Sequence, residues 1–159
     1  MLSIVSSLLT IKPKIKIDGS KLIAKTSPMI LALSLYFRNK VVTIDRRKKL
    51  VKIDSTWFWV FKNSTIIPFQ QIEGITYKYD NFWFDFSLNL GTKDQVEEFT
   101  VSLKLTGSDQ TIKLFSFVGE GIVNAPINDY EEFDLSGNQE SSSKNYVELV
   151  MKFTEKKLI

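Results

Sequence analysis

Five positive side chains within seven residues are the strongest candidates for chemistry in this sequence. They are Arg46, Arg47, Lys48, Lys49 and Lys52. Several cations that converge on one phosphate group bind it far more tightly than a single cation does, so this run predicts an anion-binding site. The alternative is a solvated tight turn in which like charges keep a sheet edge from pairing with another strand.

Aromatic side chains form the second group, since 11 of the 20 aromatic residues lie within residues 57–86. A strand buries one face in a small core, so aromatic residues at both parities cannot all enter that core. We expect the surplus, above all Trp57, Trp59 and Trp83, to form an interface with a protein partner or a second copy. The alternative is that the N-terminal segment covers these side chains within the monomer.

The absence of cysteine and histidine removes most of the usual catalytic chemistry. It excludes disulfides, thiolate nucleophiles, zinc sites built from Cys and His, and His-dependent triads. Asp85, Asp94, Glu97 and Glu98 are carboxylates that could pair for glycoside chemistry, but nothing in their spacing requires them to converge. The acidic run at 129–134 lacks the spacing of a calcium-binding EF-hand loop. We therefore name no catalytic residue, no metal ligand and no cofactor, and expect a protein that is not an enzyme.

Charge is strongly polarised along the chain, although the net charge is only +3. Residues 1–62 carry a net charge of +10, residues 63–143 carry −9, and residues 144–159 carry +2. This pattern favours an electrically polarised domain, or two zones that neutralise each other in the fold or across a contact between copies. Basic and aromatic residues peak in different segments, so nucleic acid is not an expected partner.

Alternation of apolar and polar residues predicts strands along most of the chain. Asp18-Gly19 and Asp80-Asn81 each predict the turn of a hairpin. The basic run at 46–49 predicts a charged hairpin loop between strands at 41–45 and 50–54.

Three further signals refine this prediction of strands. Residues 57–61 are aromatic at nearly every position, which predicts a strand covered at least in part on both faces. Pro68 predicts a strand end or an edge strand. Leu114 and Phe115 interrupt the alternation, so we expect the sheet to continue there with a slip in register.

The last part of the chain changes its period. Tyr146, Leu149, Val150 and Phe153 recur at helical spacing, which predicts one amphipathic helix that begins near Asn145 as its capping residue. The stretch before it, residues 119–143, contains glycine, proline and clustered acidic and serine residues, which predicts a loop or linker.

About seven antiparallel strands closed by one C-terminal amphipathic helix predict an α+β, mainly β, roll or barrel. At residues 41–53 and 66–75 the chain resembles the short bacterial pleckstrin-homology-like (PH-like) domains, namely their first hairpin and the "I-P-hydrophobic-x-x-I-x-x-I" entry into the next strand. The resemblance covers residues 38–159. It leaves residues 1–37 as an N-terminal extension, a hairpin plus an apolar segment, packed on the main domain.

The resemblance implies a non-enzymatic module of PH-like fold that binds proteins or assembles with itself. In lipid-binding relatives a basic loop at this place grips phosphorylated inositol headgroups, so peripheral binding to anionic membrane lipid through residues 46–49 is the second reading. An apolar-ligand-binding barrel or a carboxylate-based enzyme is the third. The apolar run at 29–37 is shorter than the roughly 20 residues that a membrane-spanning helix needs. We expect a cytoplasmic protein, with attachment to a membrane surface as the alternative.

Overall fold

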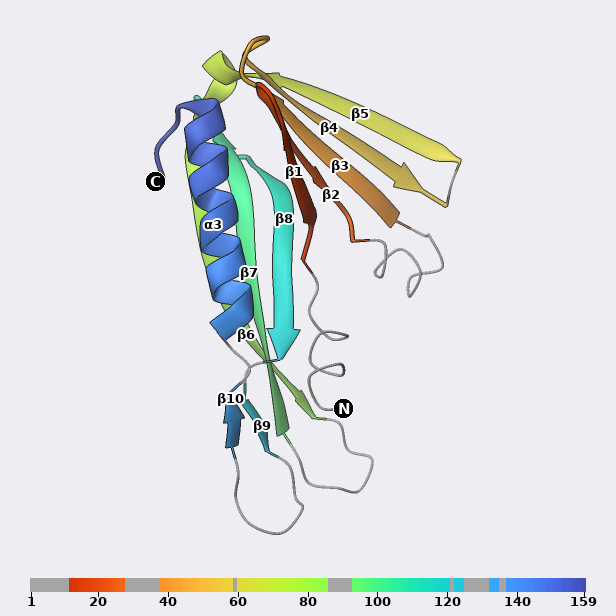
Figure 1. The fold of residues 1–159 in the computed structure, drawn as a ribbon, viewed down its shortest axis with the longest axis vertical. Helices are drawn as coiled ribbons and strands as arrows, with labels where there is room; N and C mark the ends of the chain where they lie inside the picture. The colour runs from red at the N-terminus through yellow and green to blue at the C-terminus, as the bar shows by residue number, and fades with distance from the viewer. Residues whose placement is uncertain are drawn as a thin grey trace.

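Two antiparallel sheets and one C-terminal helix form most of the part of the chain that the structure describes (Figure 1). This computed structural model describes residues 12–27, 38–58, 60–85, 93–120, 122–124, 132–134 and 137–159, with the backbone alone at 38, 82–85, 93–96, 120, 122–124, 132–134 and 137–138. The prediction of a mainly β, antiparallel α+β chain that ends in a helix is confirmed.

Eight of the described strands belong to the two main sheets, and two more form a short ribbon. The first sheet contains β1 (Lys14–Asp18), β2 (Lys21–Lys25), β3 (Arg38–Asp45), β4 (Leu50–Trp57) and β5 (Phe61–Pro68). The second contains β6 (Ile72–Asp85), β7 (Lys93–Leu105) and β8 (Thr111–Glu120), and the ribbon contains β9 (Ile122–Asn124) and β10 (Glu132–Asp134). The helix is α3 (Gly137–Thr154).

The first sheet is a meander in the order β1-β2-β3-β4-β5, with apolar side chains along its inner face. Its register places Ile17, Leu22, Ile44, Val51 and Ile67 in one row across the five strands. All of these except Ile17 are at most 3% exposed. Such a row fixes the register, because a slip of one residue would turn every one of these side chains outward.

Two predicted hairpins of the first sheet are confirmed, and one predicted strand is wrong. β1 and β2 pair around Gly19, whose φ of 55° lies in the left-handed region that glycine adopts at little cost. β3 and β4 pair around residues 46–49. Residues 57–61 do not form one strand: Trp57 ends β4, Phe61 begins β5, and the two residues pair across the turn between them.

A short corner joins the two sheets. β5 is an edge strand that ends at Pro68, so the prediction from this proline is confirmed. A 3₁₀ turn, η1 (Phe69–Gln71), follows, with Phe69 buried. The backbone N–H of Phe69 donates to the carbonyl of Lys49, which ties this corner to the β3–β4 turn.

The second sheet, in the order β6-β7-β8, contains the longest strand. Asp80 pairs with Glu98 and Asn81 with Glu97 in the middle of β6, so the predicted hairpin turn at Asp80-Asn81 is wrong. The turn tendency of such a pair is local, and the pairing with β7 along nearly the whole of β6 overrides it.

A β-bulge explains the irregular apolar pattern of β8. Val101 pairs with Phe115, whereas the next residue, Ser102, pairs with Lys113. Leu114 is therefore an extra residue on β8, and both Leu114 and Phe115 are buried. The predicted slip in register is confirmed.

The helix α3 begins eight residues before its predicted cap. It starts at Gly137 and not at Asn145, and it includes part of the predicted 119–143 linker, which also contains β9 and β10. Gln139 and Ser143 are buried, at 2% and 0% exposure. The hydroxyl of Ser143 lies 2.7 Å from that of Tyr77 on β6. These polar contacts with the second sheet stabilise the first turns of α3. The spacing of apolar residues could not predict them, because the residues involved are polar.

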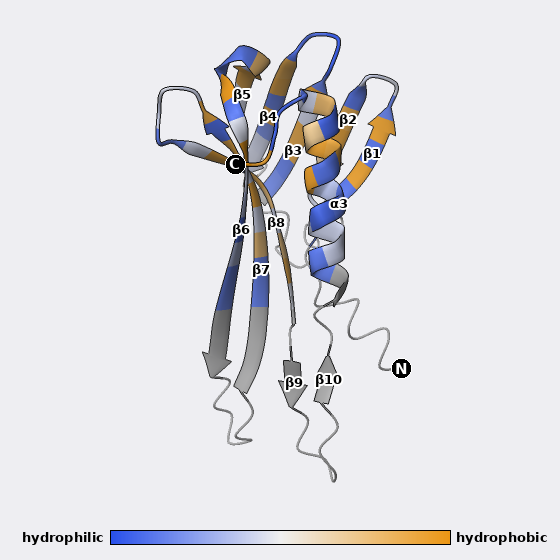
Figure 2. Ribbon diagram, turned by 90° about the vertical axis from the view of Figure 1, so that its left-hand side faces the viewer, coloured by the Kyte–Doolittle hydropathy of each residue, from blue (hydrophilic) through white to orange (hydrophobic). Residues whose placement is uncertain are grey.

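Both sheets contribute to the core around α3. The helix contacts β6, β7 and β8 of the second sheet and β2 and β3 of the first, and Figure 2 shows it standing beside β8 and the β1–β2 hairpin. Its buried apolar residues are Tyr146, Val147, Val150 and Phe153, whereas Leu149, predicted on this face, is only half-buried.

The predicted boundary at residue 37 stays a prediction. β2 pairs with β3 along its whole length, so the N-terminal hairpin continues the first sheet. The apolar run at 29–37 lies outside the described residues.

Candidate functional site

Residues 46–49, which we call the basic turn, form a turn stabilised by the carboxylate of the residue before it, Asp45. Oδ1 of Asp45 accepts hydrogen bonds from the backbone N–H groups of Arg47 at 3.0 Å and Lys48 at 3.1 Å. Lys49 follows with a φ of 51°. Asp45 is buried, at 4% exposure, while the four basic residues are exposed. The sequence Asp-Arg-Arg-Lys-Lys is thus well suited to a tight hairpin turn.

Two of the five predicted cations, Arg46 and Lys52, form ion pairs with carboxylates in the structure. Nε and Nη2 of Arg46 donate to Oε1 of Glu155, just after α3, at 3.1 and 2.9 Å. Nζ of Lys52 lies 2.9 Å from a carboxylate oxygen of Asp54 on the same strand. Arg47, Lys48 and Lys49 have no ion-pair partner among the residues that the structure describes.

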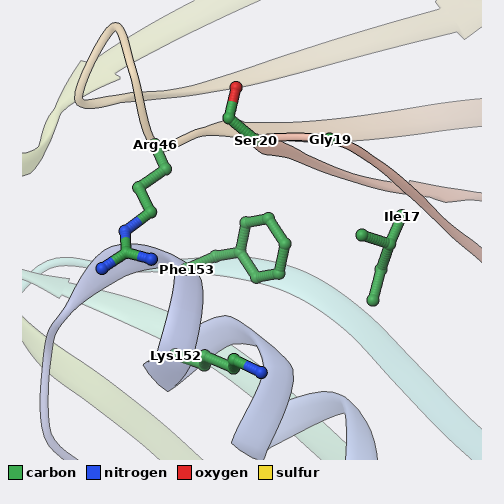
Figure 3. A pocket seen from close by; sticks show the side chains of 6 residues that line it. All are labelled: Ile17, Gly19, Ser20, Arg46, Lys152 and Phe153. Atoms are coloured by element: carbon green, nitrogen blue, oxygen red, sulfur yellow. The ribbon is translucent and has the colours of Figure 1, made fainter.

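A pocket of about 430 Å³ lies beside the basic turn (Figure 3). It is lined by Ile17, Gly19, Ser20, Arg46, Lys152 and Phe153. The wall is mostly hydrocarbon, and of its two cations Arg46 is already paired with Glu155. Sequence reasoning missed this pocket because it forms only where the β1–β2 turn meets the end of α3.

Large apolar side chains stand exposed at the other end of the same sheet. We call this group, Trp57, Phe58, Val60 and Phe61, the aromatic tip. Their exposures are 43%, 55%, 75% and 70%. The N–H of Val60 donates to the carbonyl of Trp57 at 3.2 Å, which closes the turn between β4 and β5. Of the other predicted interface residues, Trp59 and the side chain of Trp83 lie outside the described part of the chain.

Three exposed lysines lie at the same end of the first sheet as the aromatic tip; we call them the lysine belt. Lys62 is next to Phe61 on β5, while Lys14 and Lys25 face each other directly across β1 and β2. No carboxylate among the described residues forms an ion pair with any of the three. Sequence reasoning missed this group because the three residues are dispersed along the chain. The strand register pairs Lys14 with Lys25 and places Lys62 at the same end of the sheet, on β5.

Lys40 has a different role from the lysine belt, because it joins the two sheets. Its ammonium group donates to the backbone carbonyl of Lys113 on β8, and it lies 5.9 Å from the centre of the Phe115 ring. This contact joins β3 of the first sheet to β8 of the second sheet.

Of the four candidate carboxylates, the two whose side chains the structure describes, Glu97 and Glu98, have different partners. Glu98 accepts a hydrogen bond from Lys113 at 2.7 Å, and this partner lowers the pKa of Glu98. Glu97 instead accepts a hydrogen bond from the hydroxyl of Tyr79 at 3.0 Å. The side chains of Asp85 and Asp94 lie outside the described residues.

Neither a metal site nor a membrane-spanning helix is seen in the described part of the chain. Among those residues no group of three or more acidic, histidine or cysteine side chains could hold a metal ion, and no helix is both long and apolar enough to cross a bilayer. Comparison of the sequence with protein-family models and curated proteins, and of the structure with solved structures, gives no match.

Proposed function

We propose that this chain is a non-enzymatic binding module that makes its contacts through the aromatic tip. The observation that carries the proposal is the exposure of four large apolar side chains at one hairpin end, from 43% for Trp57 to 75% for Val60. Water is an unfavourable neighbour for such a group, and exposed apolar side chains gathered at one hairpin end are typical of an interaction site.

We also propose that the module has a PH-like fold. The resemblance, over residues 38–159, is supported by the order of elements from β3 onward: three strands of the first sheet, three strands of the second sheet, and a helix that packs against both sheets. A fold of this kind hosts many functions, so the resemblance alone does not carry a ligand.

Membrane binding through the basic turn is the second candidate. Arg47, Lys48 and Lys49 favour it, since they are exposed and have no ion-pair partner in the described part of the chain. The pairing of Arg46 with Glu155 and of Lys52 with Asp54 counts against it, because both cations would have to exchange a carboxylate for a phosphate.

The test compares two double variants of matched chemistry. Val60→Ser with Phe61→Ser removes apolar surface from the aromatic tip, and Ile17→Ser with Ile66→Ser removes it from two other exposed positions (52% and 58%). Self-association by sedimentation velocity and binding to lipid vesicles by co-sedimentation are measured for each. We expect the tip variant to lose at least one of these two interactions and the control variant to keep it. A wild-type chain that shows neither interaction, or a tip variant that behaves like wild type, would overturn the proposal.

A further inference from the structure

We infer that the aromatic tip inserts into the surface of an anionic membrane, with the lysine belt contacting the lipid headgroups. This inference rests on the proposed function, since it names the partner of the same tip. It assigns membrane contact to the end of the first sheet opposite the basic turn. The proposed site consists of the aromatic tip and the lysine belt alone.

The depth of the two groups matches a membrane interface. Lys62 is one residue from the Trp57–Phe61 pair, and the row that contains Lys14 and Lys25 crosses β4 at Asp54, three residues before Trp57. A strand rises about 3.3 Å per residue, so this row lies roughly 10 Å behind the tip. Interfacial apolar groups enter the headgroup boundary to about 5–10 Å. The lysines would then lie at the level of the lipid phosphates.

The five strand ends at this side of the sheet lie along one line in Figure 1, from the start of β1 to the turn between β4 and β5. Trp and Phe are suited to the headgroup boundary, because a large apolar ring can enter the acyl region while the strand behind it stays hydrated.

The lysines of the belt are placed at a cost that an anionic surface would relieve. Lys14 and Lys25 are directly opposite each other on neighbouring antiparallel strands, an arrangement that destabilises a sheet through repulsion. Both are exposed and carry no ion pair to a described residue. A negatively charged surface converts this repulsion into attraction for two charges at once.

Two segments of the sequence that are attached to this end of the sheet contain no charged residue. Residues 1–11 precede β1 and residues 28–37 join β2 to β3, so both are covalently attached here, and neither contains an acidic or basic residue. In the sequence segments 12–17, 21–27, 38–43 and 53–66 the single acidic residue is Asp54, which pairs with Lys52. The opposite end carries Asp18, Asp45 and Glu155.

A second copy of the chain fits this surface less well than a membrane does. The exposed part of the four tip side chains amounts to roughly 450 Å², judged from the 150–250 Å² that an aromatic side chain buries. A stable protein interface needs about 800 Å² from each partner. Two tips in contact would also place Lys62 of one copy near Lys62 of the other, because this lysine lies one residue behind the tip, and like charges oppose such a contact.

The experiment uses the full chain and vesicles of two compositions, phosphatidylcholine alone and phosphatidylcholine with about 30% phosphatidylserine. Bound fraction is measured by co-sedimentation over a range of lipid concentrations. We expect wild type to bind the anionic vesicles at least tenfold more tightly than the neutral ones. Val60→Ser with Phe61→Ser should weaken this binding at least tenfold, and Ile17→Ser with Ile66→Ser should change it less than twofold.

A second pair of variants separates the two ends of the sheet. Lys14→Glu with Lys62→Glu should reduce binding to anionic vesicles by more than twenty-fivefold, from roughly fivefold for each cation lost near the surface. Arg47→Glu with Lys48→Glu should reduce it less than threefold. Far-UV circular dichroism of each variant serves as the control for folding.

Each remaining result has a defined meaning. Greater loss from the Arg47 and Lys48 variant overturns the inference and favours the basic turn. Equal binding to both vesicle types overturns the role of the lysine belt. If wild type binds no vesicles but self-associates, and the tip variant does not, the inference fails while the proposed function stands. If the tip variant matches wild type in both assays, the inference and the proposed function fail together.

Discussion

Replacing Tyr146 by phenylalanine is expected to make the protein more stable. The side chain is fully buried, and its ring lies 6.1 Å from that of Phe115 and 5.7 Å from that of Phe117, measured between centroids. Its hydroxyl has no hydrogen-bond partner among the residues that the structure describes. The substitution keeps the ring and removes only the oxygen.

Two effects set the magnitude. A buried polar group without a partner costs about 1–3 kcal/mol, so Tyr146→Phe should raise the free energy of unfolding at neutral pH by about 1 kcal/mol. Burial also raises the pKa of Tyr146 well above its ordinary value of 10.0. At pH values above the ordinary pKa of 10.0, this tyrosine loses its proton in the unfolded chain and keeps it in the folded chain. This group therefore lowers the stability of wild type by about 1.4 kcal/mol for each further pH unit.

The assay is urea unfolding followed by far-UV circular dichroism at neutral pH and at two values above the ordinary tyrosine pKa. The gain from Tyr146→Phe should be constant below that pKa and should grow above it, because the variant has no proton to lose at this position. A loss of more than about 1 kcal/mol at neutral pH would refute the reasoning, since it would mean that the hydroxyl makes a favourable hydrogen bond. A difference that does not change with pH would refute the titration argument.

Three more predictions concern contacts between elements. Gly119→Ala should destabilise the fold by about 2 kcal/mol, because the added Cβ would meet the side chain of Gln139 on α3. The destabilisation should be smaller in a Gln139→Ala background, and additive effects in a double-mutant cycle would contradict this explanation. Arg46 and Glu155 are both more than half exposed, so their coupling in a double-mutant cycle should be below about 1 kcal/mol and should fall further in high salt; a stronger, salt-independent coupling would show a buried pair. The ammonium group of Lys113 lowers the pKa of Glu98. The stability that Glu98 contributes is therefore present above the ordinary pKa of 4.5 and is lost as the pH falls through the lowered pKa. Urea unfolding of wild type and Glu98→Gln should converge over this range, and a constant difference would contradict the assignment.

The local signals in the sequence predicted the hairpins of the first sheet well. Gly19 allows the left-handed turn between β1 and β2, and the four basic residues at 46–49 cannot be buried together, so each segment has one favourable local structure. The irregularity at Leu114 was also visible, because a bulge must leave two neighbouring apolar residues on one face.

Features that depend on distant partners were not predictable in this way. Asp80-Asn81 is a good turn sequence, yet its place in β6 is set by β7. The start of α3 depends on burial of Gln139 and Ser143 against the second sheet. Neither contact leaves a periodic pattern in the sequence.

The same limit applies to the candidate site. The run at 46–49 was correctly placed in a loop, but the pairing of Arg46 with Glu155 spans more than one hundred residues and removes one of its cations. The aromatic residues at 57–61 indicated a surplus that a core could not hold. That they form a hairpin tip at the same end of the sheet as Lys14 and Lys25 follows from strand register, which the sequence alone left open.

The last residues of the described chain occupy the outer edge of β6. The N–H of Ile75 donates to the carbonyl of Lys157, and the N–H of Ile159 donates to the carbonyl of Ile75, both at 2.9 Å. An edge strand with unpaired backbone groups is a template for fibrillar aggregation. Here the chain fills that template at Ile75 with its own backbone, so a strand from another molecule must first displace the tail before the second sheet can grow outward at this point.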